Sequence, residues 1–240
     1  MNWILVYEKE LNSNHLVQLT GERHLHIQTI LKKNLNESVQ VVIPSSGNYL
    51  FQVHSVSENS TTLEKKETLP DVLKPLDVEF FFSLPRPQTG KKLLHLSGGY
   101  GVHSVYFFGT DSKNKEYWTS PVYGKDLNSY LETGMSQTGN SQFPNVHAEK
   151  NASWRSFLKS WKGKVVVLDR EGETLSKDFL NLKETEEKFL FVFGPESGWK
   201  PDEILFFKES GFKILSLGKI NLRTEFAYSA FLHQLFLIKN

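Results

Sequence analysis

Hydrophobic and polar positions form one pattern before residue 69 and a different pattern after residue 75. In the first part, short runs that alternate or are rich in β-branched residues are separated by turn-forming stretches, as in half-buried strands. These runs cover residues 39–43, 49–56 and 61–64. Residues 22–33, which precede them, carry apolar residues at near-helical spacing and predict one helix. The first part is therefore predicted to be a small antiparallel barrel or sheet.

After residue 75 the apolar runs no longer alternate, which is expected of strands buried on both faces. These runs cover residues 78–84, 102–108, 164–168, 188–193 and 212–217. Helical stretches are predicted at residues 126–138, 201–210 and 226–238. Alternating strands and helices predict an α/β fold with a parallel sheet covered by helices.

A short polar stretch between two prolines, at residues 69–75, separates the two hydrophobic patterns. Proline-bracketed polar segments are typical of linkers, because they interrupt helices and strands and lie at the surface. We therefore predict two domains, residues 1–72 and residues 76–240. No internal repeat or low-complexity tract is visible in the sequence.

The composition excludes several kinds of chemistry. The 240 residues include no cysteine, which rules out disulfides, a cysteine nucleophile, a thiolate zinc site and an iron–sulfur cluster. The first ten residues lack the basic start and apolar run of a signal peptide, and no stretch of eighteen apolar residues occurs. These features predict a cytoplasmic protein with no membrane segment.

Charge and histidine content add little support for particular ligands. The formal net charge is +1, so the overall charge does not indicate nucleic-acid binding. A local basic patch is compatible with that balance, and RNA is also recognised by shape and by its 2′-hydroxyls. His24 and His26 do not complete a metal site by themselves, and we expect them on a solvated helix. No metal is predicted.

The most informative segment is residues 189–203, where a buried strand runs into Gly194-Pro-Glu-Ser-Gly198 and Pro201 then opens a helix. This order puts a tight loop at the carboxyl edge of the sheet, where open α/β folds bind their ligands. Glu196 contributes nothing obvious to stability in so constrained a loop. The loop is therefore predicted to be functional rather than a plain connection.

A second segment of the same kind covers residues 214–225, where a strand is followed by a glycine, a polar loop and a helix that Thr224 can cap. Consecutive strand–helix units usually lie side by side, so the two loops are predicted to share one pocket. Arg223 and Glu225 are either part of that pocket or a local ion pair.

These two segments resemble the RsmE family of 16S rRNA uridine-N3 methyltransferases. Residues 194–203 are similar to the family loop G-P-E-G-G-[FW]-x(3)-E, and residues 217–225 are similar to the loop L-G-x-R-I-L-R-T-E-T-A. Weaker similarity extends over residues 20–32 and 85–94. The sequence departs from the family where E-L-G becomes Gly99-Tyr-Gly101 and where E-Q-[SC]-G-R becomes Ser136-Gln-Thr-Gly-Asn140.

The resemblance implies a PUA-like N-terminal β-barrel and a C-terminal SPOUT domain, whose parallel sheet forms a trefoil knot and binds S-adenosylmethionine at a homodimer interface. It implies 16S rRNA or the small ribosomal subunit as partner. By the same resemblance, a set of loop residues is expected to hold the cofactor. They are Leu168, Phe193, Gly194, Glu196, Gly198, Leu217, Gly218, Leu222 and Thr224.

The resemblance also implies roles in catalysis and RNA binding. Arg223 is expected to stabilise the charge that develops when uridine N3 loses its proton, and Glu196 or Glu225 to position the base or accept that proton. Five basic residues are expected to contact RNA, namely Arg23, Lys32, Lys33, Lys91 and Lys92. Two alternatives remain open: a SPOUT methyltransferase with another RNA target, and a non-catalytic knotted RNA-binding or assembly protein.

Overall fold

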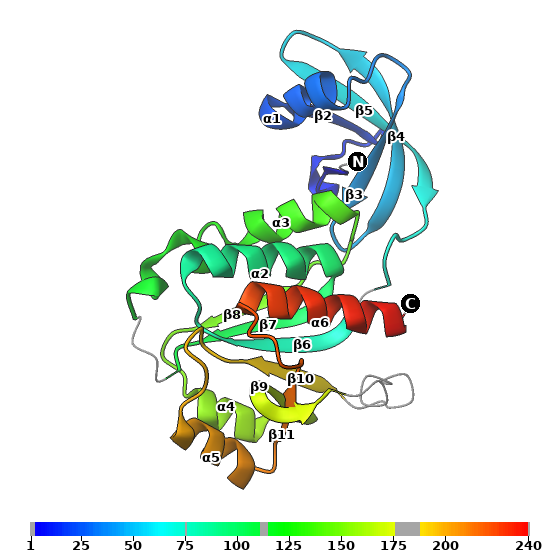
Figure 1. Ribbon diagram of the computed structural model, residues 1–240. Coiled ribbons are helices and arrows are strands. Elements are labelled where there is room, and N and C mark those ends of the chain that lie inside the picture. Colours follow the sequence, from blue (N-terminus) through cyan, green and yellow to red (C-terminus); the bar gives the residue numbers. More distant parts are fainter. Residues whose placement is uncertain (1–2, 75, 111–114, 176–187, 240) are drawn as a thin grey trace.

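Two β-sheets organise the protein, in a computed structural model that describes residues 3–74, 76–110, 115–175 and 188–239. Figure 1 shows the smaller sheet at one end of the molecule and the larger sheet, sandwiched between helices, at the other. Helix α3 lies between the two parts. Along the parts of the chain that the structure describes, no helix is long and apolar enough to cross a membrane.

The N-terminal sheet is curled and has the strand order β1-β3-β4-β5-β2. β1 pairs with β3 in parallel and the other neighbours are antiparallel, so the predicted antiparallel arrangement holds for β2 to β5. Alternating side chains such as Val17 and Leu19 are buried, which explains the alternation in the sequence. The strands are β1 (Ile4–Leu5), β2 (Leu16–Thr20), β3 (Ser38–Ile43), β4 (Gly47–Val56) and β5 (Ser60–Leu69).

The helical segment of this part is shorter than the sequence predicts. After the short η1 turn (Glu8–Glu10), helix α1 (Gly21–Leu25) continues into a π-helical turn, η2 (His26–Ile30), and ends there. Lys32 has a left-handed backbone with φ of 50°, so Lys32 and Lys33 lie beyond the helix. The expectation of a solvated His24 is wrong, because its ring is buried and its Nδ1 lies 2.8 Å from the hydroxyl of Thr61.

The larger sheet has six strands in the order β11-β9-β10-β6-β7-β8, all parallel. The predicted parallel sheet is thus confirmed. β7 has the predicted bounds, β9 begins as predicted but runs six residues further, and the ends of β6, β10 and β11 differ from the prediction by at most two residues. The strands are β6 (Leu76–Ser83), β7 (Val102–Phe108), β8 (Asn145–Glu149), β9 (Lys164–Thr174), β10 (Phe189–Phe193) and β11 (Lys213–Ser216).

Helices cover both faces of the larger sheet (Figure 1). One side carries α2 (Pro87–Tyr100), α3 (Leu127–Thr138) and α6 (Thr224–Lys239), and the other carries α4 (Trp154–Ser160) and α5 (Pro201–Glu209). Two 3-10 turns, η3 (Lys115–Thr119) and η4 (Pro121–Tyr123), precede α3. The predicted helices at 126–138, 201–210 and 226–238 correspond to α3, α5 and α6.

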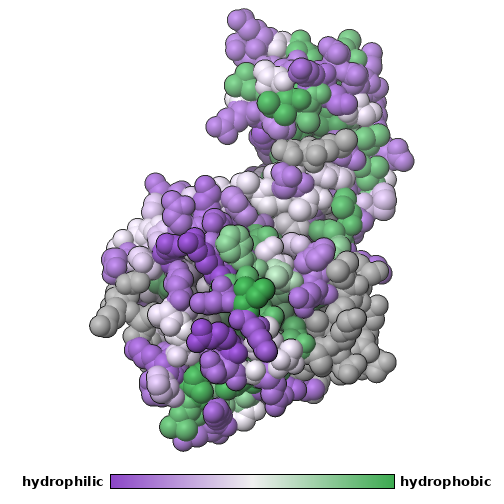
Figure 2. Space-filling view, viewed as in Figure 1, coloured by the Kyte–Doolittle hydropathy of each residue, from purple (hydrophilic) through white to green (hydrophobic). Residues whose placement is uncertain are grey.

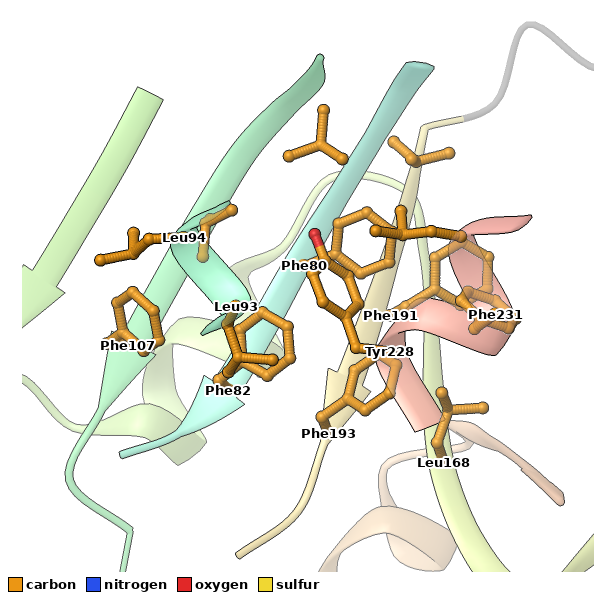
Figure 3. Close-up of a cluster of buried hydrophobic side chains, with 14 of the residues drawn as sticks. Phe80, Phe82, Leu93, Leu94, Phe107, Leu168, Phe191, Phe193, Tyr228 and Phe231 are labelled. Atoms are coloured by element: carbon orange, nitrogen blue, oxygen red, sulfur yellow. The ribbon is translucent and has the colours of Figure 1, made fainter. Parts of the chain in front are cut away.

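Phenylalanines form the centre of the core, as Figure 3 shows. Phe80 and Phe82 of β6 point to one face of the sheet, where the ring of Tyr228 meets each edge-on with centroids 4.9 Å apart. Phe81, between them, faces α4 and α5. The hydroxyl of the fully buried Tyr228 is 2.9 Å from that of Ser97, so the one polar atom of this ring is satisfied.

Helices α2 and α3 approach each other closely because glycines line their contact. A Cβ atom added at Gly98 would overlap the carbonyl oxygen of Leu131, and one added at Gly134 would overlap that of His95. The side chain of Asn140 closes the same contact from the end of α3, donating to the carbonyl of Gly98 at 2.7 Å. Asn140 therefore stabilises the fold, where the related family carries an arginine.

The N-terminal part is attached to α3 by both backbone and side chains. The backbone N–H of Trp3 donates to the carbonyl of Ser136 at 2.7 Å, and the hydroxyl of Tyr7 donates to the carboxylate of Glu132. The indole of Trp3 packs so tightly on Gly139 that a Cβ there would overlap it. Through α3, which packs on α2, the smaller sheet is therefore tied to the helices over the larger one.

An ion pair joins α2 to the first turn of α6. The Nζ of Lys92 lies 3.0 Å from Oε1 of Glu225, whose side chain is only 4% exposed. Burial acts to raise the pKa of Glu225, but hydrogen bonds from its own backbone N–H and from Lys92 outweigh that effect and hold the pKa below its ordinary value of 4.5. The carboxylate is therefore kept charged.

The glycine contact predicts that Gly98→Ala destabilises the protein although alanine favours helices. Because the added methyl meets a backbone oxygen, we expect a loss of about 1–3 kcal/mol in the free energy of unfolding, measured by urea denaturation. Gly99→Ala is the matched control, since the nearest atom to its Cβ would be a methyl of Thr138, at 3.2 Å, and the nearest backbone oxygen would be 3.5 Å away. Equal stability of the two variants would contradict the close approach of α2 and α3.

The ion pair predicts that Lys92→Met destabilises the protein by about 1–3 kcal/mol at pH 7, because it leaves a buried carboxylate without its cation. Because the pKa of Glu225 is lower in the folded than in the unfolded protein, its charged carboxylate stabilises the fold at pH values above the unfolded pKa. This stabilisation is lost as the pH falls through the folded pKa. The difference in the free energy of unfolding between Lys92→Met and wild type should therefore decrease below pH 4.5. Lys91→Met is the control, and an equal loss in both variants at pH 7 would refute the role of the pair.

Candidate functional site

A large cavity opens at the carboxyl ends of β9, β10 and β11, with a volume of about 1450 Å³. Because the three strands are parallel neighbours, they end at the same edge of the sheet, where the second half of β9 and the loops after β10 and β11 line the cavity. The loop after β6, the strand on the other side of β10, also reaches this cavity. The shared pocket that the sequence predicts is therefore lined by the second half of β9 and by the loops after β6, β10 and β11.

The loop after β10 is held in a fixed shape by its own residues. The indole N–H of Trp199 donates to the carbonyl of Leu168 at 3.3 Å, and a Cβ at Gly194 would come within 2.8 Å of this indole. Gly198 has a left-handed φ of 79° and closes a turn with Pro195. Glu203, the acid at the end of the motif, accepts the backbone N–H of Lys200 at 2.8 Å and so caps α5.

The loop after β11 is more open. The hydroxyl of Ser216 lies within hydrogen-bond distance of both the N–H and the carbonyl of Gly218, which has a φ of 117°. Beyond this turn Ile220, Leu222 and Arg223 are exposed, and α6 begins at Thr224. In Figure 2, hydrophobic surface lies among hydrophilic surface near the start of α6. This loop therefore presents both apolar side chains and a guanidinium to solvent.

All the residues that the sequence links to the cofactor line this one cavity, although they come from segments up to 56 positions apart in the chain. Arg223 and Glu225 line it as well. The cofactor candidates are Leu168, Phe193, Gly194, Glu196, Gly198, Leu217, Gly218, Leu222 and Thr224. The structure thus brings the two sequence motifs together, while the roles of the individual residues stay predictions.

The two glutamates considered as proton acceptors both have partners. Oε1 of Glu196 accepts the backbone N–H of Arg86 at 3.2 Å, and Glu225 pairs with Lys92. The sequence did not single out Arg86 or Tyr117 as site residues, yet both line the cavity. Arg86 lies in the weakly similar stretch at 85–94, whereas Tyr117 carries no signal that sequence reasoning can use.

The five basic residues expected to contact RNA lie outside this cavity. Arg23 donates to both oxygens of Glu10, at 2.6 and 3.1 Å, and to the carbonyl of Leu5, so its guanidinium holds the N-terminal part together. Lys91 lies over the ring of Tyr130, 5.1 Å from its centroid. With Lys92 paired to a buried carboxylate, the exposed Lys32 and the half-buried Lys33 are the members that form no ion pair among the described residues.

No group of three or more histidine, aspartate or glutamate side chains within the described ranges is arranged to hold a metal ion. The cavity instead combines backbone groups of glycine-bearing loops with aliphatic and aromatic side chains, among them Leu168, Phe193 and Leu217. Such a lining suits an organic ligand with a flat ring and polar edges.

A family model described as RNA methyltransferase domain matches residues 72–235 of this chain. A curated relative, the ribosomal RNA small subunit methyltransferase E of Treponema pallidum, is 24% identical over 241 residues, which cover 96% of this chain and 88% of the relative. The resemblance stated from the two loops is thereby confirmed.

Solved structures share the fold over nearly the whole chain. A ribosomal RNA small subunit methyltransferase E from Neisseria gonorrhoeae, bound to S-adenosylmethionine, superposes with a TM-score of 0.71 at 19% identity and covers 96% of this chain and 95% of its own. A probable rRNA-methyltransferase from Porphyromonas gingivalis gives a TM-score of 0.72 at 17% identity, covering 99% and 100%. Because the family model spans well over half of the sequence, the chain belongs to the RNA methyltransferase domain family.

Proposed function

We propose that this protein is an S-adenosylmethionine-dependent methyltransferase that methylates N3 of a uridine in 16S rRNA of the small ribosomal subunit. The observation that carries the proposal is the convergence of both sequence motifs on one cavity at the carboxyl edge of the parallel sheet. Family membership and the relative named for small-subunit rRNA support the reaction class. The N3 position comes from the motif resemblance.

The lining of the cavity fits the proposed cofactor. Leu168, Phe193 and Leu217 offer apolar surface for an adenine ring, and the backbone around Gly194 and Gly218 offers hydrogen-bonding groups for its edge. Space is open where a Cβ would stand at Gly218. Gly198, Leu222 and Thr224 complete the proposed contacts, whereas the carboxylate of Glu196, which also lines the cavity, is bonded to the loop after β6. The cofactor supplies a methyl group that its sulfonium already activates.

The protein's own contribution is to hold the uracil in line and to stabilise charge. A negative charge develops on the uracil ring as N3 loses its proton, and a positioned guanidinium stabilises such an anion. Arg223 is exposed, lines the cavity and has no acidic side chain within 4 Å among the described residues. We therefore assign it this role. Glu225, paired with Lys92, is better suited to fixing the start of α6 than to taking a proton.

RNA binding is proposed for the N-terminal part and for α2. Lys32 and Lys33 project beyond the π-helical turn, and Lys91 and Lys92 follow one another on α2. Arg23 can contribute only through the part of its guanidinium that Glu10 and Leu5 leave free, because its side chain is 40% exposed. We propose that the protein acts in the cytoplasm, where its ribosomal substrate lies.

We also propose the finer architecture of the related family: a PUA-like domain at residues 1–72, a trefoil-knotted SPOUT domain at residues 76–240, and a homodimer. Two separate hydrophobic cores support the two domains. The strand order supports the knot, because the chain leaves β11 at one edge of the sheet and returns, through α6, to the phenylalanines at its centre. Exposed Ile220 and Phe226 beside the cavity support the dimer.

A different RNA target is the second candidate function, and the position of Asn140 favours it. This residue stands where the related family has an arginine, and its side chain is 2% exposed and bonded to the carbonyls of Gly98 and Gln142. It therefore offers no charge to an RNA. Analysis of the modified nucleosides of 16S rRNA from cells with and without the gene separates the two candidates, because only the first predicts loss of an N3-methyluridine.

Cofactor binding gives the first test. We expect calorimetric titration to show S-adenosylmethionine binding, and Gly198→Arg to abolish it by filling the cavity. Gly211→Arg is a matched control, because Gly211 has a similar φ of 72°, has equally open surroundings and lies outside the cavity. Both variants carry the same backbone strain and charge. Unimpaired binding by folded Gly198→Arg would refute the proposed pocket.

Methyl transfer gives the second test. Loss of a positioned charge that acts in the transition state typically lowers kcat about 10²–10³-fold, and we expect this of Arg223→Ala with isolated small subunits as substrate. Its affinity for S-adenosylmethionine should stay close to that of wild type. Lys219→Ala, which removes a nearby charge from the same loop outside the cavity lining, is the control. Full activity of Arg223→Ala would argue against the assigned role.

A further inference from the structure

The loop after β6 is locked against the loop after β10. The two strands are parallel neighbours, with Phe82 beside Phe193, so their loops leave the sheet at the same level. The side chain of Glu196 crosses from one loop to the other, where its Oε1 accepts the backbone N–H of Arg86 at 3.2 Å. Glu196 thereby joins two segments that lie 110 positions apart in the chain.

Prolines on both sides of Arg86 make this contact specific. Pro85 and Pro87 have no backbone N–H and a fixed φ, so the N–H of Arg86 is the one backbone donor of this tripeptide. The carbonyl of Pro85 accepts the buried hydroxyl of Tyr123 at 2.5 Å. The turn is therefore held from one side by Tyr123 and from the other by Glu196.

The side chain of Arg86 is oriented but not neutralised. Its Nε donates to the hydroxyl of Thr89 at 3.3 Å, which leaves both terminal nitrogens for a ligand. By contrast, the cavity's Arg170 lies 3.5 Å from Glu171. Among the described residues, no acidic side chain lies within 4 Å of the guanidinium of Arg86. The exposed guanidinium is thus an oriented positive charge on the cavity that forms no ion pair with a described residue.

We propose that Arg86 binds a phosphate of the target RNA beside the methylated base, and that Glu196 is a positioning residue that holds Arg86 in place rather than a proton acceptor. The proposal rests on the proposed function. A guanidinium with two free terminal nitrogens matches the two oxygens of a phosphate. Arg86 lies in the loop after β6, at one end of the row of neighbouring strands, whereas the residues assigned to the cofactor come from β9, β10 and the loops after β10 and β11. A phosphate therefore fits better than the cofactor's carboxylate.

Arg86→Gln tests the phosphate contact. With small subunits from cells lacking this protein as substrate, we expect KM for the subunits to rise about 10–100-fold, the range that a hydrogen bond to a charged group implies. Affinity for S-adenosylmethionine should change less than about twofold, because the contact is to RNA. Arg86→Lys should recover part of the loss. Arg155→Gln, on α4 outside the cavity, removes an equal charge as control.

Glu196 is tested by comparing Glu196→Gln with Glu196→Ala. The amide oxygen of glutamine can still accept the N–H of Arg86, whereas alanine cannot. We expect Glu196→Ala to raise KM for the subunits as Arg86→Gln does, and Glu196→Gln to recover most of the loss with an unchanged pH profile of kcat. A residue that took the proton from N3 would instead give an inactive glutamine variant.

The outcomes separate this inference from the proposed function. Wild-type protein that binds S-adenosylmethionine but methylates no subunit would overturn the proposed target. Active wild type together with an unchanged KM in Arg86→Gln, or with a loss confined to cofactor affinity, would overturn the phosphate contact. An inactive Glu196→Gln that still folds would overturn the positioning role.

Discussion

The central strands of the larger sheet bury phenylalanines on both faces, and this constraint shapes everything around them. Phe80 and Phe82 need cover on one side and Phe81 on the other, so helices must lie on both faces of the sheet. Parallel strands connected through such helices all end at one edge. The loops that line the cavity gather there as a consequence, and the site follows from how the core is covered.

The sequence was sufficient to predict an element where its burial determines the pattern of apolar residues. The strand at 102–108 follows from a largely apolar run without alternation, and the helix that begins at Pro201 follows from proline at a first helical turn. Helix α2 has no such pattern, because Gly98 and Gly99 replace large apolar residues where α3 approaches. The strand β8 was also missed, since this exposed edge strand has hardly any buried residue.

The prediction of the site was also limited by what a local sequence pattern can show. Two motifs near each other in the sequence could be assigned to one pocket, because consecutive strand–helix units usually neighbour each other. The contact between Arg86 and Glu196 depends on β6 and β10 being adjacent, which follows from the whole strand order and from no local pattern. Likewise, the sequence does not indicate a partner for Arg23 or Lys92, whereas in the fold each forms an ion pair with a carboxylate.

Helix α6 has a consequence for synthesis on the ribosome. Its side chains Tyr228, Phe231, Leu232 and Leu235 are fully buried, and they pack against strands made earlier, among them β6 with Phe80 and β10 with Phe191. Until α6 has left the exit tunnel, Phe80 and Phe191 have no cover on that face. The nascent larger domain must therefore pass through a stage with exposed aromatic surface, at which chaperones that bind such surface can act.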